Sequence, residues 1–378
     1  PGTAGESLTM EASMENRRRF ILKGATLVAA SAAAVTVDAP FVHAQQKFQW
    51  RMSTTWTPAL DVLQGGAQRM AKIVDEMSAG RLKIQVFAGG ELMPAFGCFD
   101  ATSQGTIECF MAAPYYWAGK EPGFQWFSAV PFGFNPQGMM LWYLHGDGLK
   151  IWEEGYANFG LVPRPGPSTG VQMAGWFRKK INSIADFKGL KMRIPGLGGK
   201  IVAAAGGTVI LTPGGEIYTA LERGVIDSTE WVGPHDDMKL GLHNAARYYY
   251  YPGWHEPGTT GEFGFNKKAY DALPADLKSI VDYACQSIQV STFNDYEYKN
   301  TIALQKLKAD FKNKVEILAL SGSTLKELKK LSDQVIKEES EKTPAAKKVY
   351  ASINKFEAQL NDWRLLSEAA YHSQVATA

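Results

Sequence analysis

The chain has 378 residues, of which 45% are apolar, and a formal net charge of +2 at pH 7. A near-neutral chain with no basic run beyond residue 19 lacks the electrostatic footprint of a protein that binds nucleic acid or anionic lipid. The length and the ten tryptophans predict a large core that is shared between two lobes. The composition therefore favours binding of small molecules or of other proteins.

The first 44 residues have the layout of a cleavable export signal. Three arginines at 17–19 precede an apolar run over 24–37, and small residues follow before Gln45. The paired arginines favour the twin-arginine route of export. The apolar run has fourteen residues, which is short of the roughly 20 that a membrane span needs. We therefore expect cleavage near Gln45, and we read no pattern in the residues before Met14.

The segment after the signal is predicted to open as strand, helix, strand. Apolar and polar residues alternate over 48–53 and again over 81–86, and apolar residues recur at helical spacing from Leu63 to Met77 between them. This order is typical of a βαβ unit in a parallel sheet. Open parallel sheets bind ligands beyond the carboxyl ends of their strands.

The middle of the chain predicts a second α/β lobe. We expect strands over 171–177 and 190–194, with a short helical turn over 184–187 between them. A helix over 216–223 ends at Gly224, and the strand that starts at 225 carries Glu230 at its far end. Glu230 is therefore expected at the edge of the sheet where ligands bind.

The chain then returns to the first lobe. Residues 262–266 predict a strand, and a helix opens near 273 and continues past Cys285. At least two crossovers would join the lobes, which is typical of a hinged clam shell. We therefore assign residues 1–44 to the export segment, 45–168 and 258–322 to lobe I, 169–257 to lobe II, and 323–378 to C-terminal helices.

The C-terminal segment predicts two amphipathic helices. Thr324 and Glu327 form a capping box before the first helix, and Thr343 with Pro344 begins the second. The second helix could exceed 20 residues, and its apolar stripe comprises Val349, Ile353, Phe356, Leu360, Trp363 and Leu366. Periodicity does not say whether this stripe packs on its own lobe or forms a dimer contact.

Several motifs of enzymes and metal sites fail in context. The segment 166–170 matches Gly-x-Ser-x-Gly, but prolines at 163 and 165 interrupt the preceding strand, so we interpret it as a turn. The glycines of 196–199 lack the first glycine and the hydroxyl residue of a phosphate-binding loop. No two histidines have the spacing of a zinc site.

Three cysteines are too few for a disulfide scaffold. One pair among Cys98, Cys109 and Cys285 could close in an oxidising compartment, but buried free thiols fit the sequence equally well.

Polar residues of the middle segment suit a small anion bound with a metal ion. Arg193 ends a strand and could clamp a carboxylate with two hydrogen bonds, although a surface position or a structural salt bridge is also open. Glu230 and Glu256, if they converge, need a counter-charge, which a cation held with the Gln172 amide would supply. His255 is expected to line the same cleft.

Two aromatic clusters are candidate pocket walls. They are Tyr115, Tyr116 and Trp117 in the first lobe, and the four tyrosines of 248–251 in the second. Their polar tips and the flanking glycine and proline suit a pocket, although core packing is also open.

The chain resembles the extracytoplasmic solute receptors of tripartite ATP-independent periplasmic (TRAP) transporters, the DctP-like family. The resemblance runs from the arginine-rich signal to the final helix. It is carried by four segments: Lys-Gly-Leu-Lys-Met-Arg at 188–193, Ile-Tyr-Thr-Ala-Leu-Glu-Arg-Gly-Val-Ile-Asp at 217–227, Thr-Glu-Trp-Val-Gly-Pro at 229–234 and Tyr-Tyr-Tyr-Pro-Gly-Trp at 249–254. Gln172 stands where many relatives carry arginine, which favours the branch that binds 2-oxo acids with a metal ion.

The resemblance implies two α/β lobes of the type II periplasmic binding-protein kind that close over a ligand, with a long C-terminal helix. It implies a metal ion held by Gln172, Glu230, the Trp231 main-chain oxygen and Glu256. The ligand carboxylate would meet Arg193, Arg178 or both, with Tyr115, Trp231 and His255 at the ligand. Both sodium and calcium are open, because a second arginine near the site would reverse the preference of the charge balance for calcium.

The function expected from this resemblance is a periplasmic receptor, not an enzyme. It would capture a small 2-oxo monocarboxylate such as pyruvate or 2-oxobutyrate and deliver it to the membrane permease. One alternative is a 2-hydroxy acid such as lactate bound with calcium. An alternative of another class is an exported lyase or hydrolase that acts on the same acids. Family members that exchange C-terminal helices raise the expectation of a homodimer.

Overall fold

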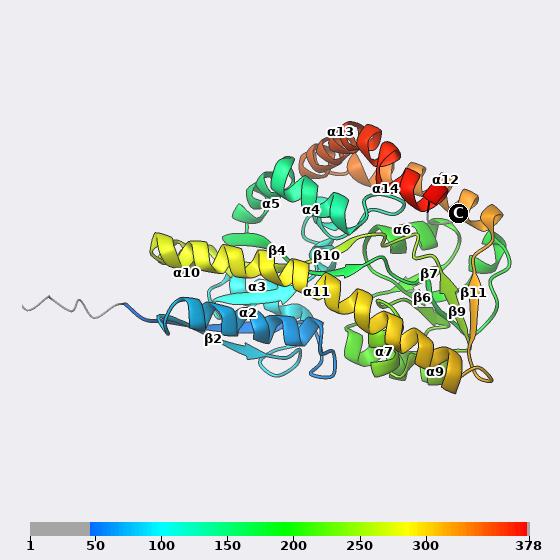
Figure 1. Ribbon diagram of the computed structural model, residues 1–378, viewed down its shortest axis with the longest axis horizontal. Coiled ribbons are helices and arrows are strands. Elements are labelled where there is room, and N and C mark those ends of the chain that lie inside the picture. The colour runs from blue at the N-terminus through cyan, green and yellow to red at the C-terminus, as the bar shows by residue number, and fades with distance from the viewer. Residues whose placement is uncertain (1–45, 376–378) are drawn as a thin grey trace, which may run out of the picture. The chain divides into compact units, whose positions relative to one another are not determined.

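The computed structural model describes residues 46–375, so the predicted export signal lies outside the described residues. Two β-sheets organise residues 47–375, as Figure 1 shows. The first sheet has the strand order β2-β1-β3-β10-β4 and the second has the order β11-β9-β5-β8-β6-β7.

The first sheet contains the predicted βαβ unit. β1 pairs in parallel with β2 and with β3, and the helix α2 (Leu63–Met77) connects β1 to β2. β10 returns antiparallel between β3 and β4, which confirms the strand expected near residue 262. The strands are β1 (Phe48–Thr54), β2 (Leu82–Phe87), β3 (Cys109–Ala112), β4 (Leu161–Gly170) and β10 (Thr259–Asn266).

β4 corrects the interpretation of the Gly-x-Ser-x-Gly segment. Pro163 and Pro165 lie inside this strand, and Ser168 belongs to it as well, where the sequence predicted a turn. β4 is at the edge of the sheet, so it needs ladder hydrogen bonds on one side only, and an edge strand tolerates proline. The strand expected over 171–177 is correspondingly reduced to β5 (Gly175–Phe177).

The second sheet gathers the middle of the chain, as predicted. The turn over Ile184–Phe187 and the strand that ends at Arg193 are confirmed. The helix α7 (Gly214–Glu222) is followed by Gly224 at φ +73, but the next strand is limited to two residues. The remaining strands are β6 (Lys191–Arg193), β7 (Thr208–Ile210), β8 (Ser228–Thr229), β9 (Tyr248–Tyr251) and β11 (Glu316–Ala319).

β11 corrects the boundary expected for lobe I. The segment 258–322 was assigned to that lobe, yet β11 pairs in parallel with β9 in the second sheet. The reason is the helix α11 (Ala275–Asp310), whose 36 residues span about 54 Å at ~1.5 Å per residue. Figure 1 shows this helix, in yellow to orange, running past elements of both sheets, and it packs on β4 and α2 of one and on α8 (Pro234–Lys239) of the other.

The other helices cover the two sheets. Aromatic side chains fill the core on the first sheet, including Trp117, Phe124, Trp142 and Trp152. The helices are α3 (Cys98–Ser103), α4 (Pro136–His145), α5 (Gly148–Ala157), α6 (Gly196–Ala204), α9 (Leu242–Ala245), α10 (Lys267–Asp271), α12 (Gly322–Ser340), α13 (Pro344–Leu366) and α14 (Glu368–Ala370). Shorter 3-10 turns include η2 (Pro114–Trp117) and η3 (Pro122–Phe127), and Tyr371–Val375 forms a π-helical turn.

The C-terminal helices form as predicted, with one shifted cap. Ser321, and not Thr324, caps α12, because its side chain accepts the main-chain N–H of Thr324. Thr343 caps α13, which has 23 residues. Val349 and Ile353 of its stripe are buried in the first-sheet core, whereas Trp363 and Leu366 are 68% and 78% exposed. Phe356 and Leu360 are partly buried against the same core, so the stripe packs on its own chain except near its end.

Cys98, Cys109 and Cys285 are all buried and free. Within residues 46–375, no helix combines the length and the apolar composition that a membrane crossing requires.

Glu262 is a buried acid without a cationic partner in its hydrogen bonds. It lies in β10 at 0% exposure, and it accepts hydrogen bonds from the Trp117 indole (2.5 Å) and the Tyr156 hydroxyl (2.7 Å). Burial raises the pKa of this carboxyl from 4.5 to about 8, against the two hydrogen bonds, which lower it. The folded protein therefore keeps the proton at neutral pH.

This buried proton makes stability depend on pH. Because the folded pKa is the higher one, Glu262 stabilises the fold fully below its unfolded pKa and loses that contribution as pH rises toward 8. In Glu262→Gln the side chain cannot ionise. We expect the unfolding free energy of the wild type to fall relative to the variant by ~1.4 kcal/mol per pH unit between these limits. Urea unfolding of both proteins at pH 5, 6.5 and 8 measures this, and parallel curves would contradict it.

Candidate ligand-binding site

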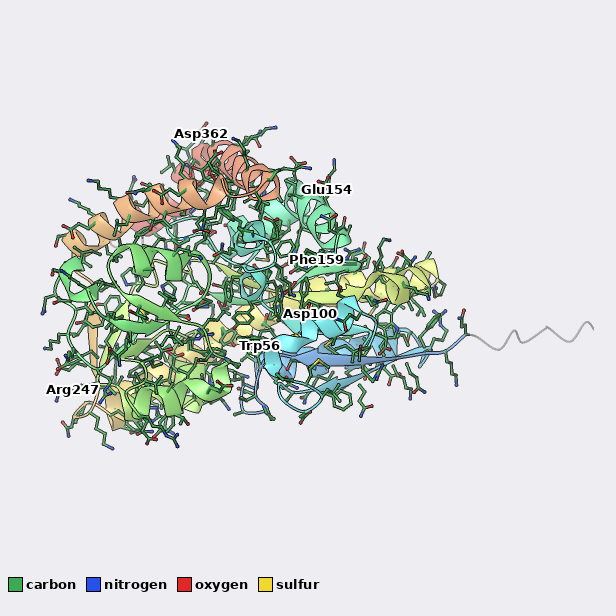
Figure 2. The ribbon with its side chains drawn as sticks, turned by 180° about the vertical axis from the view of Figure 1, so that it is seen from behind. Trp56, Asp100, Glu154, Phe159, Arg247 and Asp362 are labelled. Carbon is green, nitrogen blue, oxygen red and sulfur yellow. The ribbon has the colours of Figure 1, made fainter. Side chains whose placement is uncertain are left out.

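A pocket lies between the two sheets and is built largely from residues that follow strand ends. β3, β4, β6 and β8 all direct their carboxyl ends toward it, which is the expected ligand edge of such sheets. Figure 2 labels Trp56, just beyond β1, which lines the same space. The pocket is lined by Trp56, Leu63, Ala113, Tyr115, Tyr116, Pro167, Thr169, Gln172, Arg193, Trp231, Val232, Thr259 and Gly261.

Arg193 is the one arginine in this lining. It ends β6 at 1% exposure, and its guanidinium lies over the Trp231 ring at 5.2 Å. Nη1 donates to Glu230 Oε1 at 2.5 Å and Nε donates to the Thr212 carbonyl at 3.2 Å. Burial alone would lower the pKa of Arg193, but Glu230 raises it above its usual value. Nη2 is buried without a hydrogen-bond partner among the described residues, so one arm of the guanidinium is free for an anion.

Two buried carboxylates converge beside this arginine. Glu230 follows β8 and Glu256 lies in the β9–β10 connection, and they are 1% and 3% exposed. Ligand atoms of Glu230, Glu256 and His255 all lie within 4.8 Å of one another. Burial, and then the charge of Glu230, raises the pKa of Glu256 well above its usual value. If both carboxyls ionise, their negative charge exceeds what Arg193 alone can neutralise.

His255 is enclosed in the same cluster. Its side chain has no exposed surface, and Nε2 lies 3.7 Å from Glu230 Oε2. Neither ring nitrogen has a hydrogen-bond partner among the described residues. A buried polar group without a partner is costly, so the ring is suited to hydrogen-bond a guest molecule.

Gln172 presents a carbonyl oxygen with no partner. Its Nε2 donates to Thr169 Oγ1 at 3.1 Å and to Thr259 Oγ1 at 3.3 Å. Its Oε1 is buried and accepts no hydrogen bond from the described residues. Gly253 allows this arrangement, because a Cβ there would lie 2.1 Å from the Gln172 main-chain oxygen.

These donors fit a hard metal ion. Two carboxylates and an amide oxygen are ligands that calcium and sodium accept, and the orphaned Gln172 oxygen needs a partner. The main chain also ties the donors together, since Gln172 N–H donates to the Glu256 carbonyl and Glu230 N–H donates to the Arg193 carbonyl. Trp231, the next residue after Glu230, is 5% exposed at the same place.

The structure brings together all but one of the residues predicted for the site. Tyr115, Gln172, Arg193 and Trp231 line the pocket, and Glu230, His255 and Glu256 form the buried cluster. Of the two aromatic clusters expected as pocket walls, only the first lines the pocket, through Tyr115 and Tyr116. In 248–251, Tyr249 and Tyr250 are core residues.

Arg178 lies apart from the site, which corrects its expected position. β5 and β8 are antiparallel, with Phe177 opposite Ser228, so Arg178 lies beside Asp227 and away from Glu230. Its side chain is exposed, next to Gly224. The resemblance implied both arginines at the ligand, and the antiparallel direction of β5 places Arg178 at the opposite end.

Sequence reasoning did not single out Trp56, Thr169 or Thr259, which also line this space. The two threonines carry no motif, and only the pairing of β4 with β10 brings them to Gln172.

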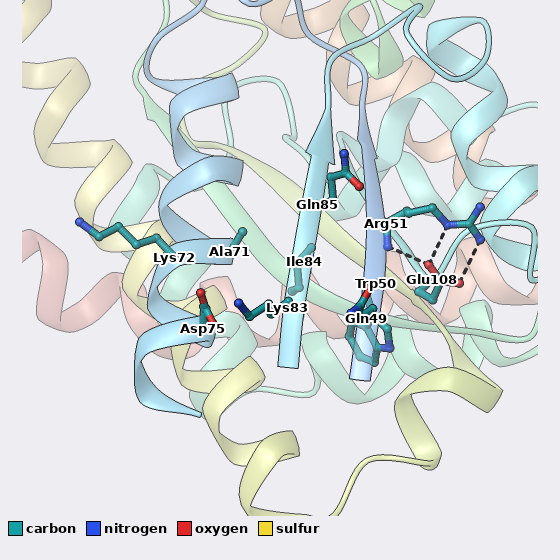
Figure 3. A pocket seen from close by; sticks show the side chains of 10 residues that line it. All are labelled: Gln49, Trp50, Arg51, Ala71, Lys72, Asp75, Lys83, Ile84, Gln85 and Glu108. Carbon is teal, nitrogen blue, oxygen red and sulfur yellow. Dashed lines mark hydrogen bonds and ion pairs between the residues drawn. The ribbon is translucent and has the colours of Figure 1, made fainter. Parts of the chain in front are cut away.

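A second hollow lies along β1 and β2, and Figure 3 shows it. It is the larger of the two hollows and is open to solvent. Arg51 pairs with Glu108 there at 3.1 Å, and no lining side chain has a buried polar atom that lacks a partner among the described residues. We therefore place the binding site in the smaller pocket between the sheets.

Comparisons with known proteins show the family to which the chain belongs. The family model for bacterial extracellular solute-binding proteins, family 7 (DctP), matches residues 52–343. The monocarboxylate 2-oxoacid-binding periplasmic protein of Nostoc sp. is 40% identical over 361 residues, which cover 94% of this chain and 98% of that protein.

Two solved structures share the fold. One is a TRAP transporter solute-binding protein of Bordetella bronchiseptica, which is 35% identical with a TM-score of 0.85 and covers 88% of this chain and 98% of that one. It is a dimer with calcium and picolinate bound in one active site, whereas the other site is apo. A TRAP periplasmic solute-binding protein of Pseudoalteromonas atlantica, with sodium and pyruvate, is 37% identical with a TM-score of 0.84, covering 87% and 99%. The predicted two-lobed α/β fold is confirmed.

Proposed function

The chain belongs to family 7 of the bacterial extracellular solute-binding proteins, and we propose that its pocket captures a small 2-oxo monocarboxylate such as pyruvate, together with a sodium or calcium ion. The receptor works in the periplasm and delivers the acid to the permease subunits of a TRAP transporter. Because the family consists of solute-binding proteins, we discard the alternative of an exported lyase or hydrolase. The observation that carries the proposal is the convergence of a free Arg193 arm and a free Gln172 oxygen on one buried cluster.

The ligand set of the ion is proposed as Gln172, Glu230, Glu256 and the main-chain oxygen of Trp231. Arg193 receives the carboxylate of the acid, since its Nη2 is free and planar guanidinium groups match carboxylates. Tyr115, Trp231 and His255 complete the contacts with the acid. When bound, the ion supplies positive charge to two glutamates and to the acid.

Charge balance favours calcium over sodium in this chain. Glu230, Glu256 and one monocarboxylate give −3, and Arg193 returns +1, because Arg178 is remote. Calcium brings the sum to zero, whereas sodium leaves −1 in a buried site, where unpaired charge is costly.

Closure of two lobes is proposed to bury the acid. We assign the first sheet with α2–α5 to one lobe, and residues 171–257 with β11 to the other. Asp61, between β1 and α2, supports this closed arrangement, since it contacts His235 (2.8 Å) and Lys239 (3.3 Å) of α8. Each ion pair at such an exposed position contributes little free energy to stability, so the contact can open.

Isothermal calorimetry of the mature protein with pyruvate tests the proposal. We expect tight binding with calcium, weaker binding with sodium, and at least 100-fold weaker binding after chelation with no ion returned, because the acid would then add a second uncompensated buried charge. Lactate in the same titration tests the 2-hydroxy acid alternative. Small-angle X-ray scattering should show a smaller radius of gyration when the ion and the acid are both bound than for the ligand-free protein. Absence of binding to pyruvate, 2-oxobutyrate and lactate under every condition would exclude the substrate class.

Arg193 and Arg178 form a matched pair for this titration. Arg193→Lys removes the planar fork and should weaken pyruvate binding by at least tenfold. Arg178→Lys should leave the affinity unchanged, since this side chain is exposed at the far end of β5. Equal effects of the two substitutions would reject the assigned role of Arg193.

A homodimer through the end of α13 is proposed as the oligomeric state. Trp363, Leu365 and Leu366 are 68%, 66% and 78% exposed on this helix, and exposed apolar side chains that cluster mark interaction surfaces. The Bordetella bronchiseptica relative is a dimer. Trp363→Glu with Leu366→Glu should convert a dimer to a monomer in light scattering. Tyr283→Glu on α11, also exposed at 66%, is the control, and a wild-type monomer at micromolar concentration would refute the dimer.

Export by the twin-arginine route is proposed from residues 17–19. Replacing Arg17, Arg18 and Arg19 together by lysine keeps the charge but removes the guanidinium groups. We expect the precursor to remain in the cytoplasm, as followed by fractionation and blotting. Normal delivery of this variant to the periplasm would indicate the general secretory route.

A further inference from the structure

We propose that Thr259, assisted by Thr169, is a positioning residue that fixes the orientation of the Gln172 amide and thereby presents its oxygen to the ion. Neither threonine contacts the ion in this scheme. The inference rests on the proposed function, since it concerns the same ion site. It follows from the direction of four hydrogen bonds in the buried wall of the pocket.

The hydroxyl hydrogens of both threonines are already used. Thr259 Oγ1 donates to Glu256 Oε2 at 2.6 Å, and Thr169 Oγ1 donates to the Gly170 carbonyl at 3.3 Å. Each hydroxyl therefore offers only lone pairs to Gln172. An amide can satisfy two such acceptors only with its NH₂ group, and both bonds are present, at 3.3 Å to Thr259 and 3.1 Å to Thr169.

The opposite orientation of the amide is unfavourable. It would turn Oε1 toward two oxygen lone pairs and would direct the NH₂ group away from both acceptors. In the observed orientation Oε1 is buried with no partner among the described residues. The two threonines therefore leave Gln172 with a carbonyl oxygen directed away from them and available to a cation.

Irregular pairing of two strands brings the threonines together. Thr259 pairs with Gly170 and Thr260 pairs with Ser168, so Thr169 is an extra residue on β4 with no partner on β10. A bulge of this kind redirects a side chain, and bulges are frequent near functional sites. Here it allows one hydroxyl from each strand to reach the same amide.

Thr259 has the larger effect of the two because its single hydroxyl contacts two of the proposed ion ligands. It accepts from Gln172 and donates to Glu256. Thr169 contacts Gln172 alone among the proposed ligands. A purely structural role, in which both hydroxyls only satisfy buried polar atoms, would change stability without changing ion affinity.

The test compares Thr259→Val with Thr259→Ser. Valine keeps the shape and removes the hydroxyl, whereas serine keeps the hydroxyl. We measure calcium affinity of the mature protein, without any acid, by competition with a chromophoric chelator, and we record melting temperatures of the ion-free proteins. We expect Thr259→Val to bind calcium ~10–100-fold more weakly, as removal of such outer contacts typically does, and Thr259→Ser to restore affinity to within about threefold of the wild type.

Thr260→Val is the matched control. Thr260 is the next residue on β10, it is fully buried, and its hydroxyl has no partner among the described residues. This variant should keep the wild-type calcium affinity. Thr169→Val serves as the second variant if Thr259→Val does not fold, and it should weaken calcium binding by a smaller factor.

The outcomes separate this inference from the function on which it rests. Equal calcium affinity of Thr259→Val and the wild type, with a lowered melting temperature, would overturn the inference and leave the receptor function intact. A wild type that binds neither calcium nor sodium, with or without pyruvate, would overturn the proposed function and the inference with it. Loss of affinity in Thr260→Val equal to that in Thr259→Val would also overturn the inference.

Discussion

The structure of this protein depends on one electrostatic constraint: two buried glutamates lie beside a single buried arginine. Glu230 is paired with Arg193, and Glu256 is left with a raised pKa and no cation of its own. Burial of unpaired charge costs several kcal/mol, so Glu256 can ionise in this cluster only with an outside partner. A cation, with an anion attached to the free arm of Arg193, would satisfy both needs at once, which supports the proposed joint binding of an ion and an acid.

The two-sheet topology serves this constraint. Arg193 and Glu230 come from neighbouring parallel strands, so their side chains meet at one sheet edge. Gln172 and Glu256 lie on two of the segments that cross between the sheets, next to each other through a main-chain hydrogen bond. The site is therefore assembled where the sheets are joined, and a movement of one sheet relative to the other would change the distances among its ligands.

The rest of the molecule supports this arrangement with packing. The long helix α11 packs on elements of both sheets, and the first half of α13 closes the aromatic core of the first. Even the buried acid Glu262 is compatible with this core, because its proton removes the charge. The end of α13 carries an exposed tryptophan and two exposed leucines, which this core does not cover.

The sequence by itself determined the βαβ opening, the second α/β segment, the helix caps at Gly224 and Thr343, and the set of Gln172, Arg193, Glu230 and Glu256. These depend on local periodicity and on short motifs, which are written in consecutive residues. Only the tertiary structure decided that Pro163 and Pro165 belong to an edge strand and that β11 joins the second sheet. It also decided that Arg178 lies at the end of β5 away from the site, and that Thr259 contacts Gln172. Each of these depends on strand order, direction or register, and hydrogen bonds between distant segments set those properties without leaving a pattern along the chain.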